Sequence, residues 1–155
     1  MKWSIFRTGK KPSISIQHPS FGLMTYHHRR WLIFGGYFTG APYFKPVSAK
    51  VPLHIVANAE GPTQAQADYF EVLETQYVSL FPEIAPRIKA AAYNGEEEFI
   101  FEDFSKDFRL QGMQIYTDKS NAILCELTFA TDLAPAYLFH VVLDGLQLKE
   151  VVISE

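Results

Sequence analysis

Histidines are the first side chains in this chain to weigh as metal ligands or general bases. There are five of them: His18, His27, His28, His54 and His140. Zinc sites use ligands at short fixed spacings such as Cys-x₂-Cys or His-x₃₋₅-His, and neither spacing occurs here. We therefore expect no metal and no other cofactor, with solvated turn histidines and a satisfied strand residue at His140. A site that folding assembles from distant histidines is the alternative.

The other candidate nucleophile is the single cysteine, Cys125, in the apolar run 123–127. A reactive thiol needs an exposed, electropositive setting, whereas this pattern predicts a strand in the core. No G-x-S-x-G, phosphate-binding P-loop or G-x-G-x-x-G motif is present. The residues therefore predict that the protein is not an enzyme.

A cluster of carboxylates follows the middle of the chain, alternating with phenylalanines between 96 and 108. Two of these carboxylates could form a general acid and base, but runs of charge are far more often solvated. Complementary charge steers protein association, so we expect a contact surface for a basic partner. The predicted contacts are Glu96, Glu97, Glu98, Glu102 and Asp103.

Aromatic residues gather in a segment, 35–50, that is also rich in Gly and Pro. Gly and Pro predict a loop, and exposed aromatics on a loop are typical anchors at protein interfaces. The predicted anchors are Tyr37, Phe38, Tyr43 and Phe44. A loop that folds back over a sheet edge is the alternative. A second alternative is nucleic-acid binding by the basic, aromatic-rich residues 1–50, although no RNP-type motif is present.

Charge is unevenly distributed along the chain. Residues 1–59 contain eight Lys and Arg and no Asp or Glu, whereas residues 60–155 contain all 17 acids and six bases. The formal net charge of −3 is therefore a near-cancellation. Such asymmetry predicts two surfaces of opposite sign, unless folding interleaves the two segments.

Apolar–polar alternation and turn residues predict the strands that position these groups. The expected strands are residues 13–17, 21–26, 31–34, 51–57, 112–117, 122–129 and 137–143, with a last strand after 145. Asp144-Gly145 predicts a type I′ hairpin turn. The apolar phase then shifts, which predicts a β-bulge near Lys149-Glu150.

A helix is predicted after residue 62, capped by Thr63 or by Gly61 with Pro62 following it. Apolar residues recur at helical spacing at Phe70, Leu73, Tyr77, Leu80, Ile84 and Ile88. Pro82 must kink the helix or start a second one. Residues 96–112 fit either a short helix or an irregular strand. The predicted class is α+β, an antiparallel sheet of hairpins with one long, kinked central helix on one face.

Length and composition indicate the number of domains and the compartment of the protein. The chain has 155 residues, of which 48% are hydrophobic and one is cysteine. We expect a single domain over residues 1–155. A lone cysteine and the lack of a signal-like start predict a cytoplasmic protein, and no apolar run is long enough to predict a membrane partner.

A family resemblance adds a function to these expectations. The segments that carry it are His18-Pro19-Ser20-Phe21-Gly22, Glu60-Gly61-Pro62-Thr63, Phe81-Pro82-Glu83-Ile84 and Val142-Leu143-Asp144-Gly145. Over residues 13–155 the chain resembles a group of small, uncharacterised bacterial α+β proteins. Some members of that group resemble immunity proteins of polymorphic toxin systems. The resemblance implies a protein-binding module that neutralises a toxin, and it transfers no catalytic residues.

Overall fold

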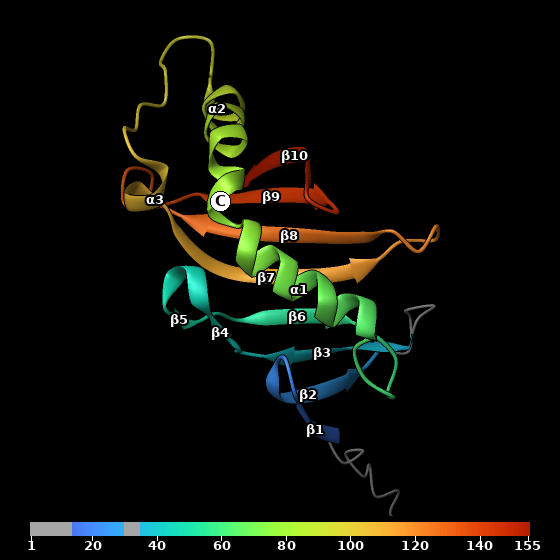
Figure 1. Ribbon diagram of the computed structural model, residues 1–155. Helices are drawn as coiled ribbons and strands as arrows, with labels where there is room; N and C mark the ends of the chain where they lie inside the picture. Colours follow the sequence, from blue (N-terminus) through green and yellow to red (C-terminus); the bar gives the residue numbers. More distant parts are fainter. Residues whose placement is uncertain (1–13, 30–34) are drawn as a thin grey trace, which may run out of the picture.

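A computed structural model describes residues 14–29 and 35–155 (Figure 1). Its strands are β1 (Ile14–His18), β2 (Gly22–His28), β3 (Gly36–Gly40), β4 (Tyr43–Phe44), β5 (Ala49–Lys50), β6 (Leu53–Val56), β7 (Arg109–Thr117), β8 (Ile123–Ala130), β9 (Leu138–Asp144) and β10 (Gln147–Ser154). Its helices are α1 (Gln64–Gln76), α2 (Phe81–Ala92) and α3 (Phe104–Asp107), with 3₁₀ turns η1 (Lys45–Val47) and η2 (Val78–Leu80). The predicted strand 31–34 lies entirely outside the described residues.

One large mixed sheet dominates the fold. Its strand order is β1-β2-β3-β6-β7-β8-β9-β10, and β4 pairs only with β5. Neighbouring strands are antiparallel except β6 and β7, which pair in parallel with Leu53 opposite Met113. The helices connect these two strands, and such a crossover lets the second strand run in the same direction as the first. The prediction of a purely antiparallel sheet is therefore wrong.

The prediction of a single long, kinked central helix is also wrong. Two short helices, α1 and α2, lie on one face of the sheet (Figure 1), with η2 between them. Pro82 stands in the first turn of α2, where its missing N–H is not needed. The proline therefore starts a new helix instead of bending an existing one. No helix in the described part of the chain is long and apolar enough to cross a membrane.

The apolar stripe of the helices packs against the sheet as its spacing predicts. Thr63 caps α1: its hydroxyl accepts from the Gln66 N–H at 3.1 Å, and the Gln66 side chain accepts from the Thr63 N–H at 3.0 Å. All six stripe residues are buried. Facing them from the sheet are the buried side chains of Phe38, Ile55, Ile115, Leu127 and Val141.

Residues 36–40 form a strand where the glycine content predicted a loop. A Cβ on Gly36 would lie 2.3 Å from the carbonyl oxygen of His27 and 2.6 Å from the Tyr26 hydroxyl. Only glycine lets these two strands approach so closely. Gly36 therefore serves close strand packing here and does not break the strand.

The C-terminal hairpin confirms the predicted bulge but not the predicted turn. The β9–β10 register shifts between Leu148 and Glu150. Asp144 pairs with Gln147, so the two turn residues are Gly145 and Leu146. Gly145 has φ 58° and Leu146 is not left-handed, which fits a type II′ turn with glycine first. The predicted type I′ turn is wrong by one residue.

The strand order separates the acid-free strands from those that follow the helices. The strands follow one another across the sheet in chain order. Residues 14–56, which carry no acid, therefore build the half of the sheet from β1 to β6. Helix α1 nevertheless brings acids back to this half, because the Glu74 carboxylate accepts from the Lys45 N–H at 3.1 Å. The two segments are therefore separate in the sheet but meet at α1.

Candidate functional site

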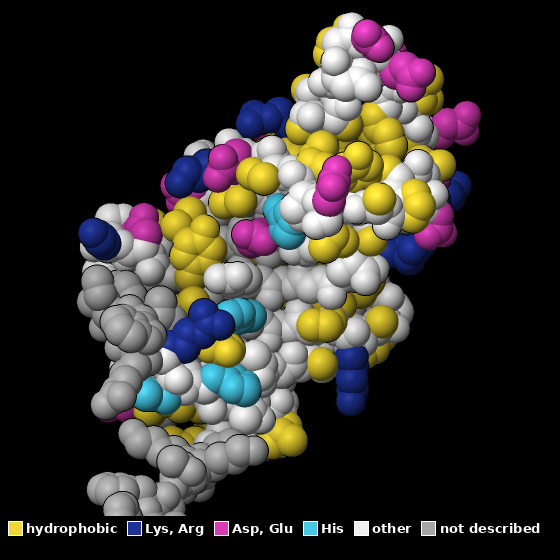
Figure 2. Space-filling model, turned by 180° about the vertical axis from the view of Figure 1, so that it is seen from behind, with side chains coloured by type: hydrophobic (Ala, Val, Ile, Leu, Met, Phe, Trp, Pro, Cys, Tyr) yellow, Lys and Arg dark blue, Asp and Glu magenta, His cyan; other side chains and the backbone are white. Residues whose placement is uncertain are grey.

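The segment between α2 and α3, residues 93–103, carries four of the five carboxylates predicted as contacts in exposed positions. It projects from the end of α2 (Figure 1), and acidic side chains gather on this protrusion in Figure 2. We call it the contact loop. The exposed carboxylates are Glu96, Glu97, Glu98 and Glu102.

Hydrogen bonds from the backbone hold the contact loop at both ends. The Asn94 side-chain oxygen accepts from the N–H groups of Glu96 and Glu97, at 3.0 and 2.9 Å. The Asp107 carboxylate accepts from the N–H groups of Glu102 and Asp103, at 3.2 and 3.1 Å. The Asp107 bonds therefore join one end of the loop to α3, whereas the Asn94 bonds form a turn within the loop.

Alternating burial gives the contact loop an outward apolar residue. Phe101 is 6% exposed and packs on Phe104 and Phe108, while Phe99 stacks on Phe139 with ring centroids 5.7 Å apart. Ile100, between Phe99 and Phe101, is 73% exposed. The two phenylalanines anchor the loop to the core, so Ile100 is presented to solvent among carboxylates.

Asp103, the fifth predicted carboxylate, is engaged within the protein. It caps α3 by accepting from the Ser105 N–H at 3.0 Å and from the Ser105 hydroxyl at 2.7 Å. Its carboxylate also lies 3.3 Å from the Lys106 Nζ. The Ser105 hydrogen bond and Lys106 lower the pKa of Asp103. Asp103 therefore shapes the base of the loop more than it offers a free charge.

The aromatic residues predicted as contacts divide into buried and accessible pairs. Phe38 and Phe44 are fully buried in the core, so neither can touch a partner. Tyr43 is 56% exposed and lines a groove of about 900 Å³ beside α1. Tyr37 lies on the face of the sheet away from the helices, where its ring contacts His27 and His54. The four residues therefore do not form one surface.

The face of the sheet away from the helices, the open face, carries a row of polar residues. Cross-strand pairing places Thr25 opposite Thr39, Thr39 opposite His54, His54 opposite Gln114, and Gln114 opposite Glu126. This polar row crosses five adjacent strands. Figure 2 shows histidines on the open face, with Lys or Arg side chains beside them.

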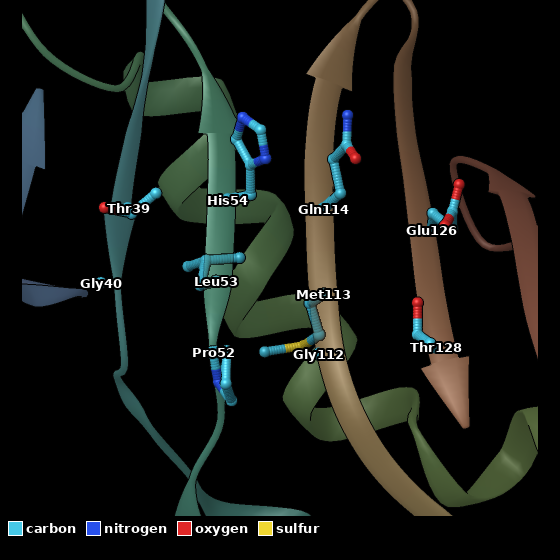
Figure 3. Close-up of a pocket in the computed structure, with 10 residues that line it drawn as sticks. All are labelled: Thr39, Gly40, Pro52, Leu53, His54, Gly112, Met113, Gln114, Glu126 and Thr128. Carbon is cyan, nitrogen blue, oxygen red and sulfur yellow. The ribbon is translucent and has the colours of Figure 1, made fainter. Parts of the chain in front are cut away.

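A shallow hollow of about 270 Å³ interrupts the open face beside the polar row (Figure 3). His54 and Gln114 lie side by side on β6 and β7, and Glu126 and Thr128 face them from β8. Gly112 leaves space here because it has no side chain. Histidine and carboxylate thus line one hollow, but no hydrogen bond joins His54 to Glu126.

His54 is held in its neutral form. Burial, together with the charges of Arg29 and His27, lowers its pKa. Its Nε2 atom is buried and has no hydrogen-bond partner among the described residues. The Tyr37 ring lies 4.1 Å from its ring, centroid to centroid, and the Arg29 guanidinium lies 4.9 Å from the Tyr37 centroid. Arg29 therefore places one positive charge beside the Tyr37 and His54 rings on the open face.

A second polar cluster joins three strands further along the open face. His140 Nδ1 lies 2.8 Å from a Glu126 carboxylate oxygen, and His140 Nε2 lies 2.8 Å from the Ser154 hydroxyl. A carboxylate only accepts, so Nδ1 carries a proton and donates it. In the neutral tautomer Nε2 then accepts from Ser154.

The order carboxylate, imidazole, hydroxyl is also that of a nucleophilic triad. Catalysis needs a substrate site and oxyanion donors beside the nucleophile as well. Ser154 and His140 line none of five hollows, of about 270 to 900 Å³, that the described residues form. Among the described residues, no group of three or more His, Cys, Asp or Glu side chains could hold a metal ion. The geometry is that of a clamp between strands.

Sequence reasoning missed the polar row and the clamp because both depend on strand register. Alternation along β8 did predict which residues face the core: Cys125, Leu127 and Phe129 are buried. It also placed Glu126 on the other face. Nothing in the sequence alone brings His140 and Ser154 to that carboxylate.

Comparison of the chain with protein-family models, with curated proteins and with solved structures gives no match.

Proposed function

We propose that this protein is a non-enzymatic binding module whose contact loop, residues 93–103, docks on a basic surface of a protein partner. The observation that carries the proposal is Ile100, which is 73% exposed on a loop held by hydrogen bonds and by two anchored phenylalanines. Ile100 is the most exposed large hydrophobic residue among those described.

The design matches the general anatomy of protein interfaces. Apolar anchors at the centre contribute most of the affinity, and a polar rim surrounds them. Here Ile100 is the anchor, with Tyr93, 56% exposed, at the start of the loop. Glu96, Glu97 and Glu98 form the charged rim. Because the loop is already held in one conformation, little ordering entropy is lost on binding.

The negative charge of the contact loop indicates which charge the partner's surface carries. Four exposed carboxylates within a few residues favour a patch of Lys and Arg, and such complementarity raises the association rate. A toxin that acts on nucleic acid carries a basic surface of this kind, because it must bind phosphates. The resemblance to immunity proteins agrees with this partner class. We propose that the protein neutralises such a toxin by direct binding in the bacterial cytoplasm.

Quantitative pull-down from the source cells tests the proposal. The wild-type chain is compared with the triple variant E96K/E97K/E98K, and with the control E60K/E71K/E83K, which changes net charge equally outside the loop. A partner enriched by the wild type and the control, and depleted about tenfold or more by the loop variant, supports the proposal. A partner lost equally from both variants, or no specific partner, contradicts it.

A further inference from the structure

The sheet has two free edges among its described strands, and they are not equivalent. β1 is five residues long and is followed directly by Pro19. β10 is eight residues long, and its regular part, Glu150–Ser154, pairs with β9 on one side only. Unpaired edge groups are a template for another strand, and β10 offers the longer template.

Among the devices that usually prevent edge pairing, the regular part of β10 carries one charged side chain, Glu150, but no proline and no lysine. Proteins protect edges with bulges, lysines, prolines or covering segments. The bulge at Leu148–Glu150 and Lys149 lie at the turn end of the strand. Beyond them the chain reads Glu-Val-Val-Ile-Ser, with β-branched residues at its centre. Val152 in the middle is 47% exposed on the open face.

We propose that β10 pairs antiparallel with β10 of a second copy of this chain, around a twofold axis at Val152. A twofold interface must be self-complementary, and this register is. Val152 lies opposite Val152 of the second copy, and Val151 lies opposite Ile153. Glu150 lies opposite Ser154, so polar side chains meet at both ends of the regular part.

Neighbouring registers lack this complementarity. A twofold axis at Val151 places Glu150 opposite the apolar Val152, and an axis at Ile153 places the apolar Val152 opposite Ser154. Side chains opposite one another in an antiparallel pair share a face, so all three registers keep the open faces together. Only the register at Val152 pairs apolar with apolar and polar with polar over residues 150–154.

The resulting dimer continues the sheet across both copies. The Leu138 and Val152 side chains, 37% and 47% exposed, lie on the open face beside the new junction. The interaction is independent of the contact loop, so a variant of one surface leaves the other unaffected.

Disulfide cross-linking tests the register. The natural cysteine, Cys125, is fully buried, so Val152→Cys introduces the one accessible thiol of the described residues. Under mild oxidation V152C is expected to form a disulfide-linked dimer rapidly. The control V78C, at a position 62% exposed on η2, is expected to cross-link only by slow collision. Equal rates for V152C and V78C overturn the proposal.

Sedimentation equilibrium provides the second measurement on the unmodified chain. The wild type is expected to show a monomer–dimer equilibrium, and V152K, with like charges at the axis, a dissociation constant raised about tenfold or more. The loop variant E96K/E97K/E98K is expected to dimerise like the wild type. A wild type that stays monomeric, or a dimer unchanged in V152K, overturns the proposal.

Discussion

His140 Nδ1 lies 2.8 Å from the Glu126 carboxylate, with both side chains largely shielded from solvent on the open face of the sheet. The same imidazole reaches Ser154 through its other nitrogen. Because the three residues stand on β8, β9 and β10, one side chain connects three strands. This clamp lies next to the free edge that we propose as the dimer interface.

Removing the clamp should weaken the C-terminal half of the sheet. We expect His140→Ala to lower the free energy of unfolding by about 1–3 kcal/mol, because it leaves a half-buried carboxylate without its donor. Urea titration measures this difference. His28→Ala, at an exposed position of β2, is the control and should change stability by less than about 0.5 kcal/mol. Equal losses in the two variants would show that the clamp contributes nothing.

Ser154 should be chemically inert despite its contact with His140. Ser154 lines none of the five hollows described above, so we expect an acylating reagent to find no binding site with oxyanion donors there. We expect intact-mass spectrometry to show no adduct after treatment with a fluorophosphonate probe, with a serine protease as positive control. A stoichiometric adduct on Ser154 that disappears in His140→Gln would contradict this and identify a nucleophile.

Stability should fall on mild acidification because of His54. Burial, then the charges of Arg29 and His27, lowers its pKa from 6.5 in the folded state. Between the lowered pKa and 6.5 the unfolded chain binds more protons, so stability rises with pH in that window. The contribution of His54 to stability is complete above about pH 6.5. Comparing urea midpoints at pH 7.5 and 5.5 checks this.

His54→Gln provides the control for the pH experiment. The amide is similar in size and does not titrate, so the variant should lose part of the difference between pH 7.5 and 5.5. The lowered pKa of His18 should leave a remainder. An identical difference in wild type and variant would exclude His54 as a source of the pH dependence.

Cys125 should react only after unfolding. It is fully buried, and burial raises the pKa of its thiol to about 12, with a smaller opposing effect of the Tyr69 hydrogen bond. Thiolate, the reactive form, is therefore almost absent at pH 8. A colorimetric thiol reagent should detect no thiol in the native protein and one per chain in denaturant. Fast reaction of the native protein would contradict the burial of this strand.

The predictions that held were those that depend on short-range periodicity. Helical spacing found the buried stripe from Phe70 to Ile88, and alternation found the buried side of β8. A change of apolar phase located the β-bulge beside Lys149. Each of these signals needs only neighbouring residues, because a core face must repeat with the period of its element.

The predictions that failed depend on contacts between distant segments. Gly36 indicates a loop when it is considered alone, and only the 2.3 Å approach of its absent Cβ to the His27 carbonyl shows why it belongs in a strand. Parallel pairing of β6 with β7 follows from how the helices cross the sheet. Phe38 and Phe44 looked like exposed anchors because their strands were not predicted.

The most direct test of the contact loop is a single substitution at its outward apolar residue. In quantitative pull-down or calorimetry with the captured partner, Ile100→Asp is compared with Leu133→Asp, at a position 54% exposed outside the loop. We predict that I100D weakens partner binding about tenfold or more, since it removes an apolar anchor, while L133D binds like the wild type. Wild-type affinity in I100D would contradict the proposal that residues 93–103 form the binding surface.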